Sequence, residues 1–374
     1  MIYLDNSATT KILPSVSKEY CKYAEELYFN PSAIYREGVL IKEKIDDVKS
    51  NILKMLGTTN GNIIFTSSAT ESNNLAIFGT MRSNFKKVIF SSAEHPSVYN
   101  VAMQLKDRGI EVDFCPLSKN GQIDYEKLEQ MLDDNVSLLS VIHISNETGA
   151  INDLKRINEI RQKKCPKAIF HVDGVQAFSK VKINVDYFGV DMYTISGHKI
   201  NAPKGISALY VRNGIVVKPI MFGGGQENNI RSGTENVPAI MGLNQAIVEI
   251  GDISKNFEYV KSLKQCFMDN LKDVCCTFNT TKQNSPYILS ISFRGVKGET
   301  LVHMMEKEGI LISTGSACSS KKAGNKVLAA MNIPANDILG SVRISFSRFN
   351  TISEVDFASK KLRECYLELI EKLR

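Results

Sequence analysis

Residues 169–176 read Ile-Phe-His-Val-Asp-Gly-Val-Gln, and residues 196–199 read Ser-Gly-His-Lys. Each stretch closes a short apolar run that predicts a strand, so Asp173 and Lys199 fall just past two strand ends. A lysine amine can bond covalently to an aldehyde cofactor, and a buried aspartate can keep a pyridine nitrogen protonated. Taken singly, a helix cap for Asp173 and a surface position for Lys199 are the simpler interpretations. Their joint position at strand ends favours a cofactor site.

The chain around these stretches alternates short strands with amphipathic helices between about residues 62 and 250. This order predicts an α/β fold, in which helices cover both faces of a mostly parallel sheet. Ligands of such sheets bind beyond the carboxyl ends of the strands. Strands are expected at 62–66, 87–90, 110–115, 138–144, 168–172 and 192–196, and helices at 71–81, 97–108 and 153–164.

The pattern changes after residue 250 and predicts a second, smaller α+β domain. We therefore expect an N-terminal arm (1–14) that packs with the small domain, a large cofactor-binding domain (15–250) and a small C-terminal domain (251–374). The small domain would carry Cys318. Its expected helices are 257–271, 299–307 and 354–373, and its expected strands are 287–293 and 342–346.

Composition narrows the class of protein. Apolar residues make up 43% and charged residues 23% of the 374 residues, which is typical of a globular chain. The net charge of +6 is spread along the chain, so direct binding of nucleic acid is not expected. The eight cysteines form no CxxC pair, which argues against a zinc site or a disulfide framework. No signal-peptide pattern and no apolar run of about 20 residues is present, so we expect a cytoplasmic protein without membrane contact.

One motif is suited to a phosphate, and a second contains glycines that permit close approach of the main chain. Residues 65–74, Phe-Thr-Ser-Ser-Ala-Thr-Glu-Ser-Asn-Asn, end a predicted strand and begin a helix with the form of a capping box, Ser68 to Glu71. A helix start of this kind suits an anion, although most capping boxes bind nothing. Residues 223–226 and 231–236 are glycine-containing loops that could equally be mobile surface segments.

Three further residues have side chains suited to catalysis or substrate binding. Cys318 has small, polar neighbours and could become a thiolate nucleophile, although a lone cysteine on such a loop is more often incidental. Arg343, on a predicted strand, could hold a carboxylate through two hydrogen bonds. His95 lies between a strand and a helix, where its ring could stack on an aromatic cofactor. His143 and His171 are expected to be packing residues.

Together these segments closely resemble the cysteine desulfurases, pyridoxal-phosphate (PLP) enzymes of the NifS/IscS type related to the class-V aminotransferases. The resemblance runs from residues 3–10, Tyr-Leu-Asp-Asn-Ser-Ala-Thr-Thr, to the Arg343 strand. It implies a PLP-dependent transferase fold of type I and a homodimer. The matching segments are 68–74, 94–95, 146–149 (Asn-Glu-Thr-Gly), 171–173, 196–199, 231–234 and 316–318 (Ser-Ala-Cys).

The resemblance also implies a role for each matching residue. Lys199 would bind PLP and later move the substrate α-proton, Cys318 would take the substrate sulfur as a persulfide, and His95 would stack on the ring and assist proton transfer. Asn146 and Arg343 would orient the substrate carboxylate, and no metal is implied. The remaining cofactor-binding residues would be Asp173 at the pyridine nitrogen, Gln176 at the ring hydroxyl, and Ala69, Thr70, Ser196 and His198 at the phosphate, joined by Thr234 from the other subunit.

This pattern implies a cysteine desulfurase that converts L-cysteine to L-alanine and passes sulfur to a protein acceptor, such as an iron–sulfur scaffold or a tRNA-thiolating enzyme. Three alternatives stay open: a selenocysteine lyase, a PLP enzyme that moves no sulfur, and a non-enzymatic sulfur carrier or assembly protein. The sequence departs from the family at 226–229, Gln-Glu-Asn-Asn in place of Gln-Glu-Arg-Gly, and at Ala202 and Tyr35. These departures concern the dimer contact and the substrate entrance.

Overall fold

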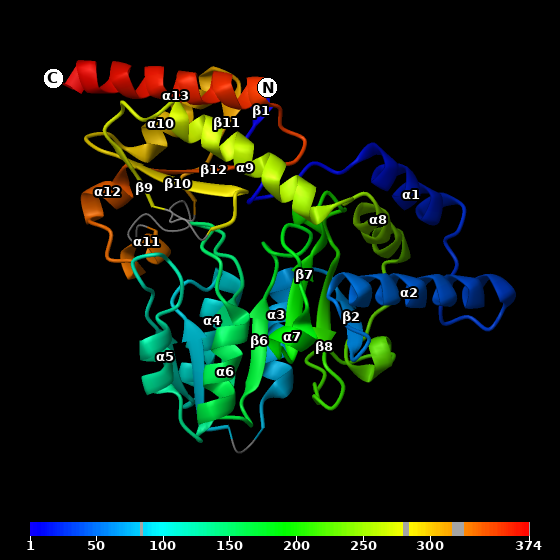
Figure 1. The fold of residues 1–374 in the computed structure, drawn as a ribbon. Helices are drawn as coiled ribbons and strands as arrows, with labels where there is room; N and C mark the ends of the chain where they lie inside the picture. Colours follow the sequence, from blue (N-terminus) through cyan, green and yellow to red (C-terminus); the bar gives the residue numbers. More distant parts are fainter. Residues whose placement is uncertain (83–84, 280–283, 316–324, 374) are drawn as a thin grey trace.

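The computed structural model describes residues 1–82, 85–279, 284–315 and 325–373 (Figure 1). Within them, seven strands form a central sheet in the order β2-β8-β7-β6-β5-β3-β4. The six strands predicted between residues 62 and 196 all occur in this sheet, and the predicted α/β fold with a mostly parallel sheet is confirmed. The strands are β2 (Asn62–Thr66), β3 (Lys87–Ser91), β4 (Glu111–Cys115), β5 (Val136–Ile142), β6 (Ile169–Asp173), β7 (Met192–Ser196) and β8 (Ser207–Val211).

Strand β8 was not among the predicted strands, and it runs antiparallel to both β7 and β2. Only ten residues separate the end of β7 at Ser196 from the start of β8 at Ser207. A parallel crossover needs a dozen or more residues, so the chain turns back beside β7 instead. Since β2 then runs parallel to β7, Thr66 and Ser196 end at the same edge of the sheet.

Helices cover both faces of this sheet (Figure 1). The strands alternate between the two faces: on β2, Ile63 and Phe65 belong to one buried cluster and Ile64 to the other. The helices α3 (Ala69–Thr80) and α4 (Pro96–Asp107) pack on the Ile64 side. The other face is covered by α1 (Pro14–Glu25), α2 (Arg36–Met55), α5 (Tyr125–Met131), α6 (Leu154–Lys164), α7 (Val185–Phe188) and α8 (Val237–Val248).

A third buried cluster lies around a smaller antiparallel sheet of the order β12-β10-β9. Three helices pack against this cluster, which also contains Leu4 from the chain start. The short strand β1 (Ile2–Tyr3) pairs in parallel with β11 (Ile310–Leu311). The elements of this part are β9 (Cys276–Phe278), β10 (Ile288–Phe293), β12 (Ser341–Ser345), α9 (Ile253–Asp269), α10 (Gly298–Lys307), α11 (Lys326–Ala330), α12 (Ala335–Leu339) and α13 (Ile352–Leu373).

The division at residues 14 and 250 stays a prediction. Leu4 packs in the smaller cluster and Val16 in the larger one, which is compatible with an arm that ends near residue 14. None of the described helices combines the length and apolar character that crossing a bilayer requires.

Candidate active site

A cavity of about 690 Å³ lies where β2, β3, β5, β6 and β7 end at one edge of the large sheet. Residues of the N-terminal arm and of β12 also line it, so both the large and the small sheet contribute to its wall. The structure brings ten of the predicted site residues together here: Ala69, Thr70, His95, Asn146, Asp173, Gln176, Ser196, His198, Lys199 and Arg343.

Two predicted residues are not among this lining. Thr234 is exposed and lines a separate cavity beside Ser67 and Arg231. Cys318 lies outside the described residues.

Asp173 ends β6 and is buried with its carboxylate held from two sides. Its Oδ2 accepts a hydrogen bond from Asn73 Nδ2 at 3.0 Å, and its Oδ1 accepts one from the Val175 amide at 3.1 Å. Asn73 lies on α3 and also donates to Ser97 Oγ at 2.9 Å. Three segments therefore fix the direction of this carboxylate at the cavity wall.

Gln176 has its amide orientation set by two partners. Its Nε2 donates to the Ser7 carbonyl at 2.9 Å, and its Oε1 accepts from Lys180 Nζ at 2.8 Å. Burial lowers the pKa of Lys180 to about 7, and the nearby charge of Lys199 adds to that effect. Lys180 was not predicted as a site residue, because only its contact with Gln176 connects it with the site.

Lys199 follows β7 in a short 3₁₀ turn, η1 (Gly197–Lys199). Its Nζ donates to the carbonyls of Ser7 and Ala8 at 2.5 and 2.7 Å, so it pairs with main-chain oxygens of the N-terminal arm. Burial lowers the pKa of Lys199 to about 8, and the charge of Arg343 contributes in the same direction. A sizeable fraction of the amine is therefore uncharged and nucleophilic near neutral pH.

His95 is the N-cap residue of α4, with Pro96 at the first helical position. Its Nδ1 accepts from the Ser97 amide at 3.2 Å and lies 2.8 Å from Ser97 Oγ. Part of the His95 side chain reaches water, but the surrounding protein removes much of the ring's hydration. This loss of hydration lowers the pKa of His95. A neutral ring whose Nδ1 accepts a hydrogen bond carries its proton on Nε2.

The start of α3 provides a candidate phosphate site. Ser68 Oγ accepts from the Glu71 amide at 3.2 Å, as in half of a capping box. The Glu71 carboxylate does not accept from the Ser68 amide, as it would in a full capping box. It accepts from the Ser67 amide at 2.8 Å and pairs with Arg231 at 2.7 Å. The first-turn amides of a helix have no partners inside the helix, so those of Ala69 and Thr70 suit an anion.

His198 and Lys204 complete this side of the cavity. His198 Nδ1 lies 3.1 Å from Thr9 Oγ1, and burial lowers the pKa of His198 to about 4. A neutral His198 would bind a phosphate by a hydrogen bond, whereas Lys204 offers a positive charge. No role was predicted for Lys204, although this residue lies only five positions after Lys199.

Arg343 and Asn146 also line the cavity and contact each other. Arg343 Nη1 donates to the Asn146 carbonyl at 3.0 Å and to Glu147 Oε1 at 3.3 Å, and Nη2 donates to Asp5 Oδ1 at 3.1 Å. Asn146 Nδ2 also donates to Glu147 Oε1, at 2.6 Å. Asp5 and Glu147 lay inside the quoted motifs, but no role was predicted for either of them.

The lining residues fit PLP. A flat aromatic aldehyde needs an amine, a carboxylate for its ring nitrogen and an anion site for its phosphate. The cavity offers Lys199, Asp173 and the start of α3 at one edge of the sheet. Its wall also contains the buried Ser7 Oγ, which has no hydrogen-bond partner within the described part of the chain.

Known proteins share this sequence and this fold. The model of the aminotransferase class-V family matches residues 2–357. A cysteine desulfurase from a Nostoc species is 37% identical over 100% of this chain and 94% of its own length, and cysteine desulfurase IscS 1 of Archaeoglobus fulgidus is 35% identical over 100% and 98%.

Among solved structures, a NifS-like protein superposes with a TM-score of 0.91 at 30% identity, covering 97% of this chain and 98% of that protein. The matches of sequence and of structure both extend over nearly the whole chain. The chain therefore belongs to the class-V aminotransferase family and, within it, to the PLP-dependent cysteine desulfurases.

Proposed function

We propose that this cysteine desulfurase transfers the sulfur of L-cysteine to Cys318 and releases L-alanine, with the residues of the 690 Å³ cavity in the roles given below. The observation that carries the proposal is the meeting of Lys199, Asp173 and Arg343 in one cavity, although they come from η1, β6 and β12. An amine, a ring-nitrogen partner and a carboxylate partner are the three groups that amino-acid chemistry on PLP requires.

The cofactor would be held at four places. Lys199 would bond to it, Asp173 would pair with its ring nitrogen, and Gln176 would donate to its ring hydroxyl. When bound, PLP withdraws electrons from the substrate and so eases the loss of the α-proton. The phosphate would lie against the start of α3, where the proposed partners are Ala69, Thr70, Ser196 and His198.

Lys199 is also the proposed base for the α-proton. Its lowered pKa, about 8, leaves the amine able to accept a proton near neutral pH and to return it. His95 would stack on the ring, and its Nε2–H would assist a second proton transfer. The carbonyls of Ser7 and Ala8 would hold Lys199 Nζ whenever it is not bonded to the cofactor.

Arg343 and Asn146 are the proposed partners of the substrate carboxylate. Two guanidinium nitrogens of Arg343 already contact Asp5 and Glu147. The buried Nε of Arg343 has no hydrogen-bond partner among the described residues, so one donor is still unused. The substrate carboxylate would compete with the protein carboxylates for this side chain.

In the sulfur step, the Cys318 thiolate would attack the substrate Sγ. A sulfur–sulfur bond forms and the carbon–sulfur bond breaks, with its electron pair left on the substrate Cβ. Protonation of Cβ gives alanine, and Cys318 keeps the sulfur as a persulfide. An acceptor protein then takes that sulfur; an iron–sulfur scaffold or a tRNA-thiolating enzyme would have the right chemistry.

A homodimer is proposed because Thr234 is expected to reach a second cofactor, and Ser232, two residues before it, packs against Gly223, which follows the exposed Phe222. Ile34 is 99% and Phe222 is 83% exposed. Tyr35, Val39 and Met221 are exposed next to them in the sequence, a composition typical of a contact between subunits. The cytoplasmic location expected from the sequence also stays a proposal.

Two variants test the proposed function. Cys318→Ser should keep the visible absorbance of bound PLP but lose persulfide formation, whereas Lys199→Ala should lose that absorbance. Alanine and cysteine-derived sulfur are measured in both. Persulfide formation by Cys318→Ser would contradict the proposal, and release of selenium without any release of sulfur would favour a selenocysteine lyase.

A further inference from the structure

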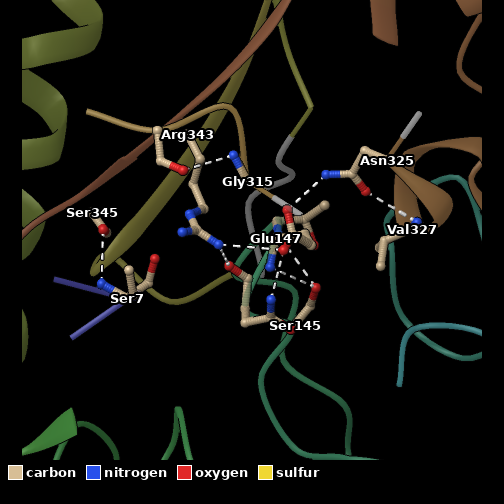
Figure 2. A network of polar contacts seen from close by, with 12 residues as sticks. Ser7, Ser145, Glu147, Gly315, Asn325, Val327, Arg343 and Ser345 are labelled. Carbon is tan, nitrogen blue, oxygen red and sulfur yellow. Dashed lines mark hydrogen bonds and ion pairs between the residues drawn. The ribbon is translucent and has the colours of Figure 1, made fainter. Parts of the chain in front are cut away.

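Glu147 occupies a central place in the polar network of Figure 2. It belongs to the loop between β5 and α6 and is only 2% exposed. Its Oε1 accepts from Asn146 Nδ2 at 2.6 Å and from Arg343 Nη1 at 3.3 Å. Its Oε2 accepts from Asn325 Nδ2 at 2.7 Å. One buried carboxylate thus joins the proposed substrate partners to Asn325.

Asn325 and Gly315 are the described residues on either side of 316–324, the segment that contains Cys318. Asn325 is 3% exposed, and its Oδ1 accepts from the amides of Val327 and Leu328, which fixes the start of α11. Gly315 packs directly on Glu147, because a Cβ at that position would overlap Glu147 Oε2. Both ends of the segment therefore rest on the same carboxylate.

The main chain makes a second connection between Arg343 and the first of these ends. The Arg343 amide donates to the Ser313 carbonyl at 2.6 Å, and the Ser313 amide donates to the Arg343 carbonyl at 3.2 Å. Ser313 Oγ in turn accepts from the Gly315 amide at 2.9 Å. A change in how Arg343 is held therefore shifts Ser313, three residues before the segment begins.

We propose that Glu147 is a positioning residue that couples occupation of the carboxylate site on Arg343 to the placement of both ends of the Cys318 segment. The proposal rests on the proposed function of Arg343 and Cys318. A substrate carboxylate adds a third negative charge around a guanidinium that already faces Asp5 and Glu147. Repulsion between the substrate carboxylate and Glu147 weakens the contact between Arg343 and Glu147. Because Glu147 also contacts Asn325 and Gly315, a shift of its carboxylate moves these two residues as well.

The test exchanges the polarity of the contact between Glu147 and Asn325. In Glu147→Gln an amide N–H faces the N–H of Asn325, and in Asn325→Asp two carboxylates face each other. The double variant restores one donor facing one acceptor and keeps the net charge. Asn332→Asp is the control, because it adds the same charge at an exposed residue beyond the same short helix.

The first readout is the rate of Cys318 persulfide formation in a single turnover, with bound PLP measured by its visible absorbance. We expect both single variants to bind PLP normally and to form persulfide about 10- to 100-fold more slowly, because the thiolate is misplaced. The double variant should return to within about threefold of the wild type, and the control should behave like the wild type.

The second readout is alkylation of Cys318 in the PLP-loaded protein with and without saturating L-alanine, followed by mass spectrometry. L-alanine presents the carboxylate but carries no sulfur. We expect it to change the alkylation rate of the wild type by at least about threefold, to have a smaller effect in both single variants, and to regain its effect in the double variant. Wild-type behaviour of the single variants, or no recovery in the double variant, would overturn the coupling. A wild-type protein that binds PLP but forms no persulfide would instead refute the proposed function.

Discussion

Glu94 illustrates at the residue scale how burial changes a single carboxyl group. It lies after β3, and its Oε1 accepts from Ser91 Oγ at 2.6 Å and from the Ile142 amide at 2.7 Å. Its Oε2 has no hydrogen-bond partner in the described part of the chain. Burial raises the pKa of Glu94 to about 8, and the charge of Asp173 acts in the same direction. At neutral pH this group is therefore mostly protonated.

The raised pKa predicts a pH dependence of stability. Between the ordinary value near 4.5 and about 8, the folded state binds a proton that the unfolded state has lost. The stabilisation from Glu94 is thus complete below pH 4.5 and is lost as the pH rises through 8. In Glu94→Gln this part of the pH dependence should be absent. Unfolding by urea at pH 5, 6.5 and 8 measures it, and an unchanged difference between the two proteins across that range would contradict the prediction.

Other residues of the site could be identified from the sequence only in part. Asp173 and Lys199 were found because strand ends can be predicted from local pattern. Lys180 was not found, because a lysine in a helical turn carries no local sign that its amine will meet Gln176. The same holds for Asp5, whose partner Arg343 lies 338 residues away in the chain.

At the scale of elements, α9 is tied to the start of β10 by one side chain. Lys264 is buried, and its Nζ donates to Asn284 Oδ1 at 2.7 Å, to the Ser285 carbonyl at 3.2 Å and to the Ile288 carbonyl at 2.8 Å. Ser285 also donates from its amide to the Gly149 carbonyl at 2.7 Å. Lys264 therefore helps to hold α9 and the segment before β10 close to the loop that follows β5.

Lys264→Met should lower the free energy of unfolding by about 2–4 kcal/mol, because buried carbonyls lose their donor while the volume stays similar. Lys261→Met is a matched control one turn earlier on the same helix. Lys261 is exposed and pairs only with Glu258 among the described residues, so its replacement should change stability by less than about 0.5 kcal/mol. Urea denaturation compares the two. Equal effects of both variants would show that the buried hydrogen bonds of Lys264 contribute little.

For the molecule as a whole, the proposed homodimer predicts which surface is covered by the second subunit. The exposed apolar side chains of residues 34–40 and 220–222 should be covered by a second copy. Phe222→Glu and Ile34→Glu should then separate the subunits, because a buried unpaired carboxylate is costly. They should also weaken PLP binding, since Thr234 would be lost from the neighbouring site.

Sedimentation and the visible absorbance of bound PLP measure both effects. Phe357→Glu is the control, because it places the same charge at an exposed apolar residue of α13, on the smaller part of the molecule (Figure 1). A dimer that persists in both interface variants would contradict the proposed contact, whatever the activity.

The sequence by itself determined the alternation of strands and helices, the α/β class, and the strand ends where Asp173 and Lys199 lie. These features depend on side-chain periodicity within short windows, so local pattern suffices to predict them. Only the tertiary structure decided that β8 runs antiparallel and that the N-terminal arm lies against Lys199. It also decided that Glu147 joins Arg343 to Asn325. Such contacts join residues far apart in the chain, and they form only when the large and the small sheet pack around one cavity, which no local pattern records.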